Sequence, residues 1–131
     1  MIVDTSAIVA FLAAEPEASQ FRTAIARSSV CRMSAFNVFE CRTVIGRRFD
    51  DSMLREFELL LLKAEINIEP FDAEQAVLAH RAYEMYGKGS GHPAALNLGD
   101  CAAFALAKAK GEPLLFKGDD FAKTDIGPAQ A

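Results

Sequence analysis

Four short apolar segments, separated from one another by helical patterns, constrain the fold of this chain more than any other feature. They are MIV at 1–3, SVCRMS at 29–34, INIEPF at 66–71 and PLLF at 113–116. Short apolar strands that alternate with helices indicate a parallel sheet covered on both faces. We therefore predict an α/β fold of the three-layer α/β/α type, with a short, mostly parallel central sheet. A further short strand is expected around Ile126.

The segments between these strands carry helical periodicity and helix-start signals. We expect Thr5 or Ser6 to cap the first helix, and Gly111 to end the helix that contains Asp100. The glycine-bearing stretch KGSGHPAALN, at 88–97, is expected to be a loop. The predicted helices cover residues 4–15, 15–28, 35–49, 50–65, 72–87 and about 98–111.

Length and composition exclude several classes of protein. The 131 residues suit one domain, 1–131, and a 51% hydrophobic fraction suggests that some apolar surface serves a partner. No run of about 18 apolar residues is present, and the N-terminus lacks a basic leader, so we expect neither a membrane span nor secretion. The three scattered cysteines, with His80 and His92 far from ligand spacing, favour reduced thiols in the cytoplasm over a zinc site. A net charge of −4 gives no bulk signal for nucleic-acid binding.

Asp100 stands beside an otherwise apolar helical run, CAAFALA at 101–107. A buried, ionised and unpaired carboxylate is costly, so this acid needs an explanation. Asn97 as the helix cap would make Asp100 the third helical residue, where an acid suits the helix dipole. The alternative is that Asp100 meets other acids at a site.

Other acids lie where such a site would form. Asp4 ends the first strand, Asp119 and Asp120 follow PLLF, and Glu40 lies in the helix after the second strand. In open parallel sheets, sites form beyond the carboxyl ends of the strands. Each acid also has an ordinary interpretation: Asp4 as a helix cap, Glu40 as a solvated residue paired with an arginine, and the Asp119–Asp120 pair as turn residues.

Converging carboxylates would require a cation. At about 5 Å, each like-charged pair costs roughly 3 kcal/mol at an effective dielectric constant near 20. A hard divalent cation removes this repulsion, and ligation by oxygen alone favours Mg²⁺ or Mn²⁺ over zinc. Such an ion can activate water and stabilise charge on a phosphodiester.

Three stretches of the chain together resemble the PIN-domain family, specifically VapC-type toxins. They are MIVDTSAIVAFL, MSAFNVFECRTVI and LNLGDCAAFALAKAKGEPLLFKGDDFAKTDI, and the resemblance covers essentially the whole chain. It implies a Rossmann-like sheet and a Mg²⁺- or Mn²⁺-dependent endoribonuclease. It also implies an RNA substrate such as tRNA and inhibition by a cognate VapB-type antitoxin. The catalytic and metal-binding residues that it implies are Asp4, Glu40, Asp100 and Asp119, with Thr5, Ser6 and Asp120 in support.

The sequence of this chain departs from the PIN-domain pattern near the last acid. Matching Asp119 in KGDDF requires a one-residue gap, so Asp120 remains a rival. Basic side chains near these acids are candidates to hold RNA phosphates, although a solvated helix face would look the same. These candidates are Arg42, Arg47, Arg48, Lys108, Lys110 and Lys117.

Three alternative functions compete with the ribonuclease interpretation. A phosphoacceptor receiver domain would require paired acids after the first strand, where only Asp4 stands. A dinucleotide oxidoreductase would require its glycines after a strand, whereas GKGSG, at 87–91, follows a helix. A PIN-like interaction module without catalysis remains the main alternative, and cleavage of an RNA pool would exclude it.

The leucine-rich segment FELLLL, at 57–62, predicts a protein-binding surface. Successive helical residues advance by about 100°, so four consecutive leucines cannot all face one core. Some are expected to be exposed. The resemblance to VapC-type toxins implies that a second copy of the chain and the C-terminal segment of the antitoxin are the occupants. The alternative is a helix buried on several sides within the domain.

Overall fold

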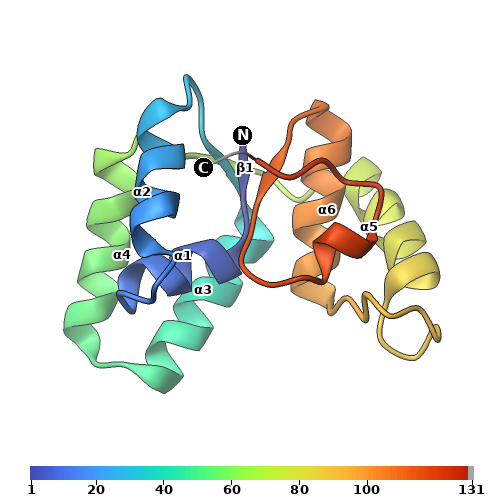
Figure 1. The fold of residues 1–131 in the computed structure, drawn as a ribbon, viewed down its shortest axis with the longest axis horizontal. Coiled ribbons are helices and arrows are strands. Elements are labelled where there is room, and N and C mark those ends of the chain that lie inside the picture. Colours follow the sequence, from blue (N-terminus) through green and yellow to red (C-terminus); the bar gives the residue numbers. More distant parts are fainter. Residues whose placement is uncertain (130–131) are drawn as a thin grey trace.

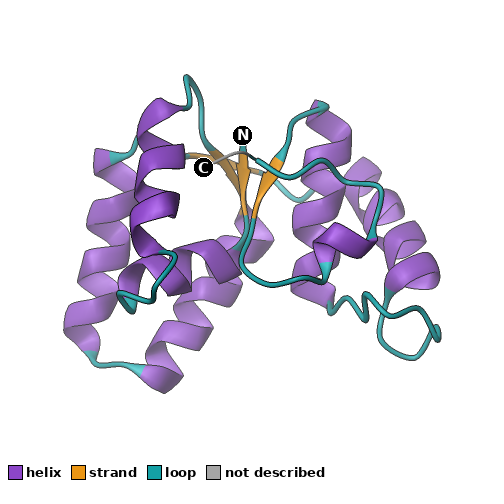
Figure 2. Ribbon diagram, in the orientation of Figure 1, coloured by secondary structure: helices purple, strands orange, loops and turns teal. Residues whose placement is uncertain are grey.

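The computed structural model describes residues 1–129 and has a four-stranded parallel sheet at its centre (Figures 1 and 2). The strands lie in the order β3-β2-β1-β4. Their bounds are β1 Ile2–Val3, β2 Arg32–Ser34, β3 Asn67–Glu69 and β4 Leu114–Leu115. The strand expected around Ile126 is reduced to a single parallel bridge between Leu114 and Pro128. The end of the predicted domain, residues 130 and 131, lies outside the described residues.

Helices cover both faces of the sheet. Figure 1 shows α1 to α4 on one side of the strands and α5 and α6 on the other. The predicted helices are thus confirmed, with ends that differ by a few residues. Their bounds are α1 Thr5–Leu12, α2 Ala18–Arg27, α3 Ala35–Arg48, α4 Asp51–Lys63, α5 Ala73–Tyr86 and α6 Leu98–Lys110, followed by the short 3₁₀ helix η1 Phe121–Lys123.

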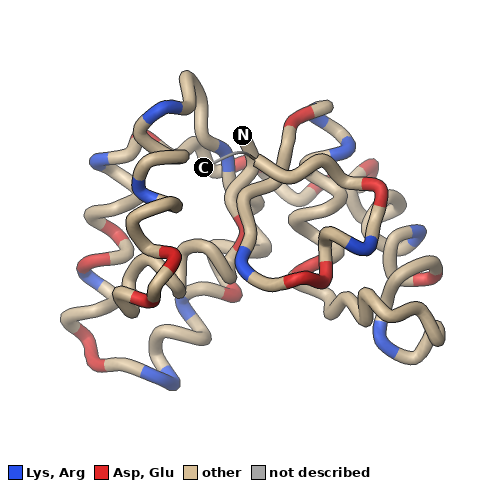
Figure 3. The backbone as a smooth tube through the Cα atoms, in the orientation of Figure 1, with Lys and Arg blue, Asp and Glu red and all other residues tan. Residues whose placement is uncertain are grey.

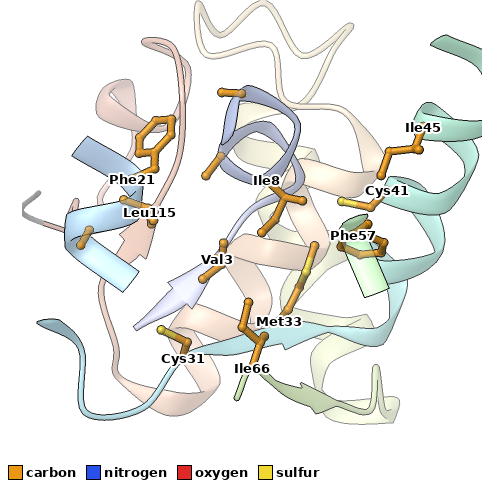
Figure 4. Packing of buried hydrophobic residues seen from close by; sticks show 13 residues of the cluster. Val3, Ile8, Phe21, Cys31, Met33, Cys41, Ile45, Phe57, Ile66 and Leu115 are labelled. Carbon is orange, nitrogen blue, oxygen red and sulfur yellow. The ribbon is translucent and has the colours of Figure 1, made fainter. Parts of the chain in front are cut away.

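Alternation along the two-residue strands divides the core into two layers. Val3 and Leu115 belong to the cluster on the α1–α4 side, whose packing is drawn in Figure 4. Ile2 and Leu114 belong to the cluster on the α5–α6 side. All of these side chains are buried, which explains why strands of a doubly covered sheet carry continuous apolar residues. The three-layer α/β/α prediction is confirmed.

The cap of α1 differs from the prediction. Asp4, rather than Thr5 or Ser6, is the N-cap, with an extended backbone and a side chain that accepts from the Ser6 N–H. This is the ordinary interpretation of Asp4 from the sequence, a helix cap, and α1 itself begins at Thr5, one residue after the start of the predicted range 4–15. Asp4 therefore satisfies a free N–H group at the start of α1.

The leucines of α4 divide between the interior and the surface. Phe57 is fully buried, whereas Leu60 and Leu61 are partly buried against the core of the α1–α4 side. Leu59 and Leu62 are exposed, with 42% and 74% of their surface accessible. The expected excess of apolar surface on this helix is confirmed.

Two further observations bear on the class of protein. The three cysteines are buried free thiols. None of the helices described in residues 1–129 combines the length and apolar character that crossing a membrane requires.

Candidate active site

The sheet brings three of the predicted acids to the carboxyl ends of its central strands. Asp4 directly follows β1, and Glu40 lies in the second turn of α3, which begins directly after β2. Asp100 lies in the first turn of α6, a helix that packs against α3. Three segments far apart in the sequence thus contribute one carboxylate each to the same region.

Asp4 is the most deeply buried of these acids, with 1% of its surface accessible. Its Oδ2 accepts hydrogen bonds from the Ser6 backbone N–H at 2.9 Å and the Ser6 hydroxyl at 2.6 Å. Its Oδ1 is buried without a hydrogen-bond partner. Burial, followed by the negative charge of Asp100, raises the pKa of Asp4 to about 7, against the effect of the Ser6 hydrogen bonds. The carboxylate therefore has one oxygen fixed and one available.

Asp100 both caps its helix and faces the other acids. Its Oδ2 accepts from the Asn97 N–H at 3.0 Å, and the Asn97 Oδ1 accepts from the Asp100 N–H at 2.8 Å. This reciprocal arrangement is a capping box. Burial, with the charges of Glu40 and Asp120, nevertheless raises the pKa of Asp100 to about 6. The capping and site interpretations of this acid are compatible.

Glu40 is held by a buried amide that sequence reasoning missed. Asn37, one turn earlier on α3, donates through Nδ2 to Glu40 Oε1 at 3.3 Å and to the Gly99 carbonyl of α6 at 2.9 Å. The Asn37 side chain is fully buried, although it stands among apolar residues in AFNVF. The sequence signal for the role of Asn37 is an amide side chain among the apolar residues of a predicted helix.

Gly99 leaves the space that the Glu40 carboxylate occupies. A Cβ atom on Gly99 would overlap both carboxylate oxygens of Glu40. The close approach of α3 and α6 at this point therefore depends on the absence of a side chain at residue 99.

The two hydroxyls after Asp4 have different contacts. Ser6 bonds Asp4 and also accepts the Lys117 backbone N–H at 2.9 Å, which ties the loop after β4 to the site. Thr5 instead donates to the Asn37 carbonyl at 3.4 Å. Ser6 is thus the hydroxyl that contacts the first acid.

The two acids after β4 are exposed and differ in their relation to Asp100. The charge of Asp120 raises the pKa of Asp100, whereas Asp119 is not among the charges that act most strongly on Asp4 or Asp100. A second group missed from the sequence is Lys88, whose charge lowers the pKa of Asp100.

Within residues 1–129, no three acidic, histidine or cysteine side chains are close enough to hold a metal ion as they stand. The acids are electrostatic neighbours rather than a closed ligand cage.

Most of the basic side chains proposed from the sequence as phosphate ligands are already paired. Arg42 contacts Glu58, Lys108 contacts Asp125, Lys110 contacts Glu69, and Lys117 contacts Glu15. Figure 3 shows Lys and Arg interspersed with Asp and Glu over the chain rather than gathered in one basic patch. Arg47 and Arg48 form no ion pair with the acids of residues 1–129.

Comparisons with known proteins identify the family of this chain. The PIN domain family model matches residues 1–127. Ribonuclease VapC42 of Mycobacterium tuberculosis is 51% identical over 129 residues, which covers 98% of both chains. Ribonuclease VapC28 of the same species is 46% identical over 126 residues, which covers 96% of this chain and 95% of the relative.

Solved structures share the fold at much lower sequence identity. Mycobacterium tuberculosis VapC20, described as a toxin that cleaves the sarcin-ricin loop, has a TM-score of 0.77 at 19% identity, over 99% of this chain and 98% of that one. A chain of a toxin-antitoxin complex from Klebsiella pneumoniae has a TM-score of 0.66 at 16% identity, over 92% and 89%. Together, the family match and the close relatives establish that this chain belongs to the PIN-domain family and, within it, to the VapC ribonucleases.

Proposed function

We propose that this chain is the toxin of a toxin–antitoxin pair, a divalent-metal-dependent endoribonuclease that acts in the cytoplasm on structured RNA such as tRNA. The observation that carries the proposal is the Asp4 carboxylate: it is buried, one oxygen has no partner, and Asp100 and Glu40 raise its pKa. A buried carboxylate surrounded by like charges is unfavourable unless a cation binds there. Membership of the VapC ribonucleases supplies the reaction class.

The residues present fit Mg²⁺ or Mn²⁺. Asp4, Glu40 and Asp100 would hold the ion, and they offer only carboxylate oxygens, the ligands that these hard cations prefer. The unpartnered Asp4 Oδ1 is a free ligand position. When bound, such an ion lowers the pKa of a water molecule and stabilises negative charge on the phosphodiester.

The remaining residues of the site position the three acids. Ser6 fixes Asp4 through Oδ2, so that Oδ1 stays available. Asn37 fixes Glu40, and the capping box fixes Asp100. Because each carboxylate is held by a separate hydrogen bond, little reorganisation is required when substrate arrives.

RNA cleavage by the purified, antitoxin-free chain tests this function directly. We expect cleavage of total RNA at discrete sites with Mg²⁺ or Mn²⁺, and none with excess EDTA, when the new RNA ends are mapped by sequencing. Absence of cleavage with either metal would instead favour the PIN-like interaction module without catalysis.

The identity of the fourth acid is a separate proposal. Because its charge acts on Asp100, Asp120 is better supported by the structure than Asp119, the residue favoured by the sequence. We expect Asp120→Asn to reduce the cleavage rate at least tenfold and Asp119→Asn to reduce it less. Rates measured in parallel on the same RNA decide the assignment, and a larger loss for Asp119→Asn would restore the sequence prediction.

An apolar groove of about 900 Å³ between α2 and α4 is our candidate for the antitoxin site. Phe11, Ile25 and Leu60 to Leu62 line it. We propose that an apolar segment of a VapB-type antitoxin binds there and brings an arginine or lysine to the acidic site, which would inhibit by blockage and by charge. The structural similarity to a chain of a toxin-antitoxin complex supports this partner class. A homodimer stays a prediction.

Leu62→Glu tests the groove without disturbing the core, because 74% of Leu62 is exposed. Burying the new carboxylate against an apolar segment is costly, so we expect at least 100-fold weaker binding of the separately purified antitoxin. Val77→Glu on α5, where Val77 is 52% exposed, is the matched control and should bind normally. Equal binding by both variants, measured by titration calorimetry, would remove α4 from the antitoxin interface.

A further inference from the structure

A second hollow, of about 410 Å³, borders one carboxylate of the candidate active site, that of Glu40. Phe36, Phe39 and Val44 of α3 and Leu98 of α6 line it, and Glu40 forms part of its wall. Phe39 and Leu98 are 67% and 66% exposed, so two large apolar side chains of this hollow face solvent together. The hollow is therefore an apolar surface that shares a residue with the candidate active site.

The same face of α3 continues to an unpaired cation. Residues 36, 39, 40, 43, 44 and 47 recur at the spacing of one helix face. Arg47 is exposed and forms no ion pair with the acids that the structure describes. It lies seven residues after Glu40, about 10 Å along the helix axis at 1.5 Å per residue. The face thus presents the exposed aromatic ring of Phe39, the carboxylate of Glu40 beside it, and the guanidinium of Arg47 two turns further along the helix.

We propose that this hollow binds one nucleobase of the RNA substrate, stacked on Phe39, with the neighbouring backbone phosphate at Arg47. The inference rests on the proposed function, because the RNA must pass the carboxylates to be cleaved. Exposed aromatic side chains next to cations are how proteins hold unpaired bases. The subsite would set a base preference beside the cleaved bond.

The hollow suits a base better than a second copy of the chain. A stable dimer buries about 800 Å² on each partner around an apolar centre. Of the described residues that line this hollow, Phe39 and Leu98 are the exposed large apolar ones, and two charged side chains, Glu40 and Arg47, lie on the same face of α3 as Phe39. A small apolar hollow with a site carboxylate in its wall, on a helix face that continues to a cation one turn after Val44, matches the alternation of base and phosphate along RNA.

Binding and photo-cross-linking of RNA test the subsite separately from catalysis. The probe is a random 20-nucleotide RNA with 5-bromouridine in place of uridine, and the protein carries Asp4→Asn so that the RNA stays intact in Mg²⁺. We expect irradiation to cross-link the RNA to Phe39. In this background, Phe39→Ala should weaken binding about tenfold and Phe39→Trp should retain it. Arg47→Gln should lower the slope of log affinity against log salt by about one.

Met85→Ala on α5, where Met85 is 61% exposed, is the matched control and should bind as the parent does. In the chain with Asp4 intact, Phe39→Ala should cleave RNA but lose the base preference at one position beside the cut. Undiminished binding and an unchanged preference would overturn the subsite, as would Phe39→Ala converting a dimer to a monomer in sedimentation. If the unaltered chain fails to cleave RNA, the proposed function fails instead.

Discussion

Asp4→Asn is expected to abolish RNA cleavage while raising the melting temperature of the metal-free protein at pH 8. The amide oxygen of asparagine can still accept from Ser6 and cap α1, so the fold is preserved. The substitution removes the buried charge that Asp100 and Glu40 repel. One pKa unit corresponds to about 1.4 kcal/mol, so we expect a gain of a few kcal/mol and a rise of roughly 5–10 °C.

The pH dependence of this gain follows from the direction of the pKa shift. The pKa of Asp4 rises from 3.8 in the unfolded chain to about 7 in the folded one, so the folded state binds more protons between these values. The stability of the metal-free protein should therefore fall as pH rises from about 4 to about 7. Asp4→Asn should flatten this fall, and its stabilising effect should vanish near pH 4.

Thermal melting in EDTA across this pH range, together with RNA cleavage in Mg²⁺, measures both effects. Saturating Mg²⁺ should raise the melting temperature of the unaltered chain at pH 8 and leave that of Asp4→Asn nearly unchanged. A variant that melts lower at every pH would show that Asp4 is primarily a structural cap.

Gly99→Ala is expected to reduce cleavage by at least tenfold without loss of stability. The new Cβ would overlap the Glu40 carboxylate, whose long side chain can swing away from the site. Alanine is also a better helix former than glycine, so the helix itself is not weakened. The predicted result is a folded protein whose Glu40 is displaced from Asp4 and Asp100.

Gly46→Ala on α3 is the matched control, because a Cβ atom there meets nothing within 4 Å. It should keep full activity and gain up to about 1 kcal/mol of stability. If Gly99→Ala cleaves RNA as fast as Gly46→Ala, the position of Glu40 does not matter for the reaction.

The layers of the fold were predictable because two simple patterns specify them. Strands of continuous apolar residues alternate with helices, and this requires a sheet covered on both faces. The same pattern placed Asp4 and Asp100 near the carboxyl ends of the strands. Ile2 and Val3 point to opposite faces of the sheet, and each is buried in a different cluster. This assignment of side chains to faces becomes visible only when the strands are paired.

The parts of the site that were not predicted depend on contacts between distant segments. Asn37 and Gly99 matter because α3 and α6 touch, and nothing local in the sequence encodes that approach. The choice between Asp119 and Asp120 depends on the path of an exposed loop, which residue spacing does not fix. Lys88 lowers the pKa of Asp100 because the loop before α6 folds back on itself. In this loop the Lys88 backbone N–H donates to the Leu96 carbonyl.

The central claim is that Asp4, Glu40 and Asp100 together bind a divalent cation, and anomalous diffraction from crystals grown with Mn²⁺ tests it most directly. We expect an anomalous peak at the manganese edge bounded by these three carboxylates and in contact with Asp4 Oδ1. The peak should be absent from Asp4→Asn crystals grown in the same way. A chain that cleaves RNA in Mn²⁺ but shows its manganese peak elsewhere, or none at this site, would contradict the account.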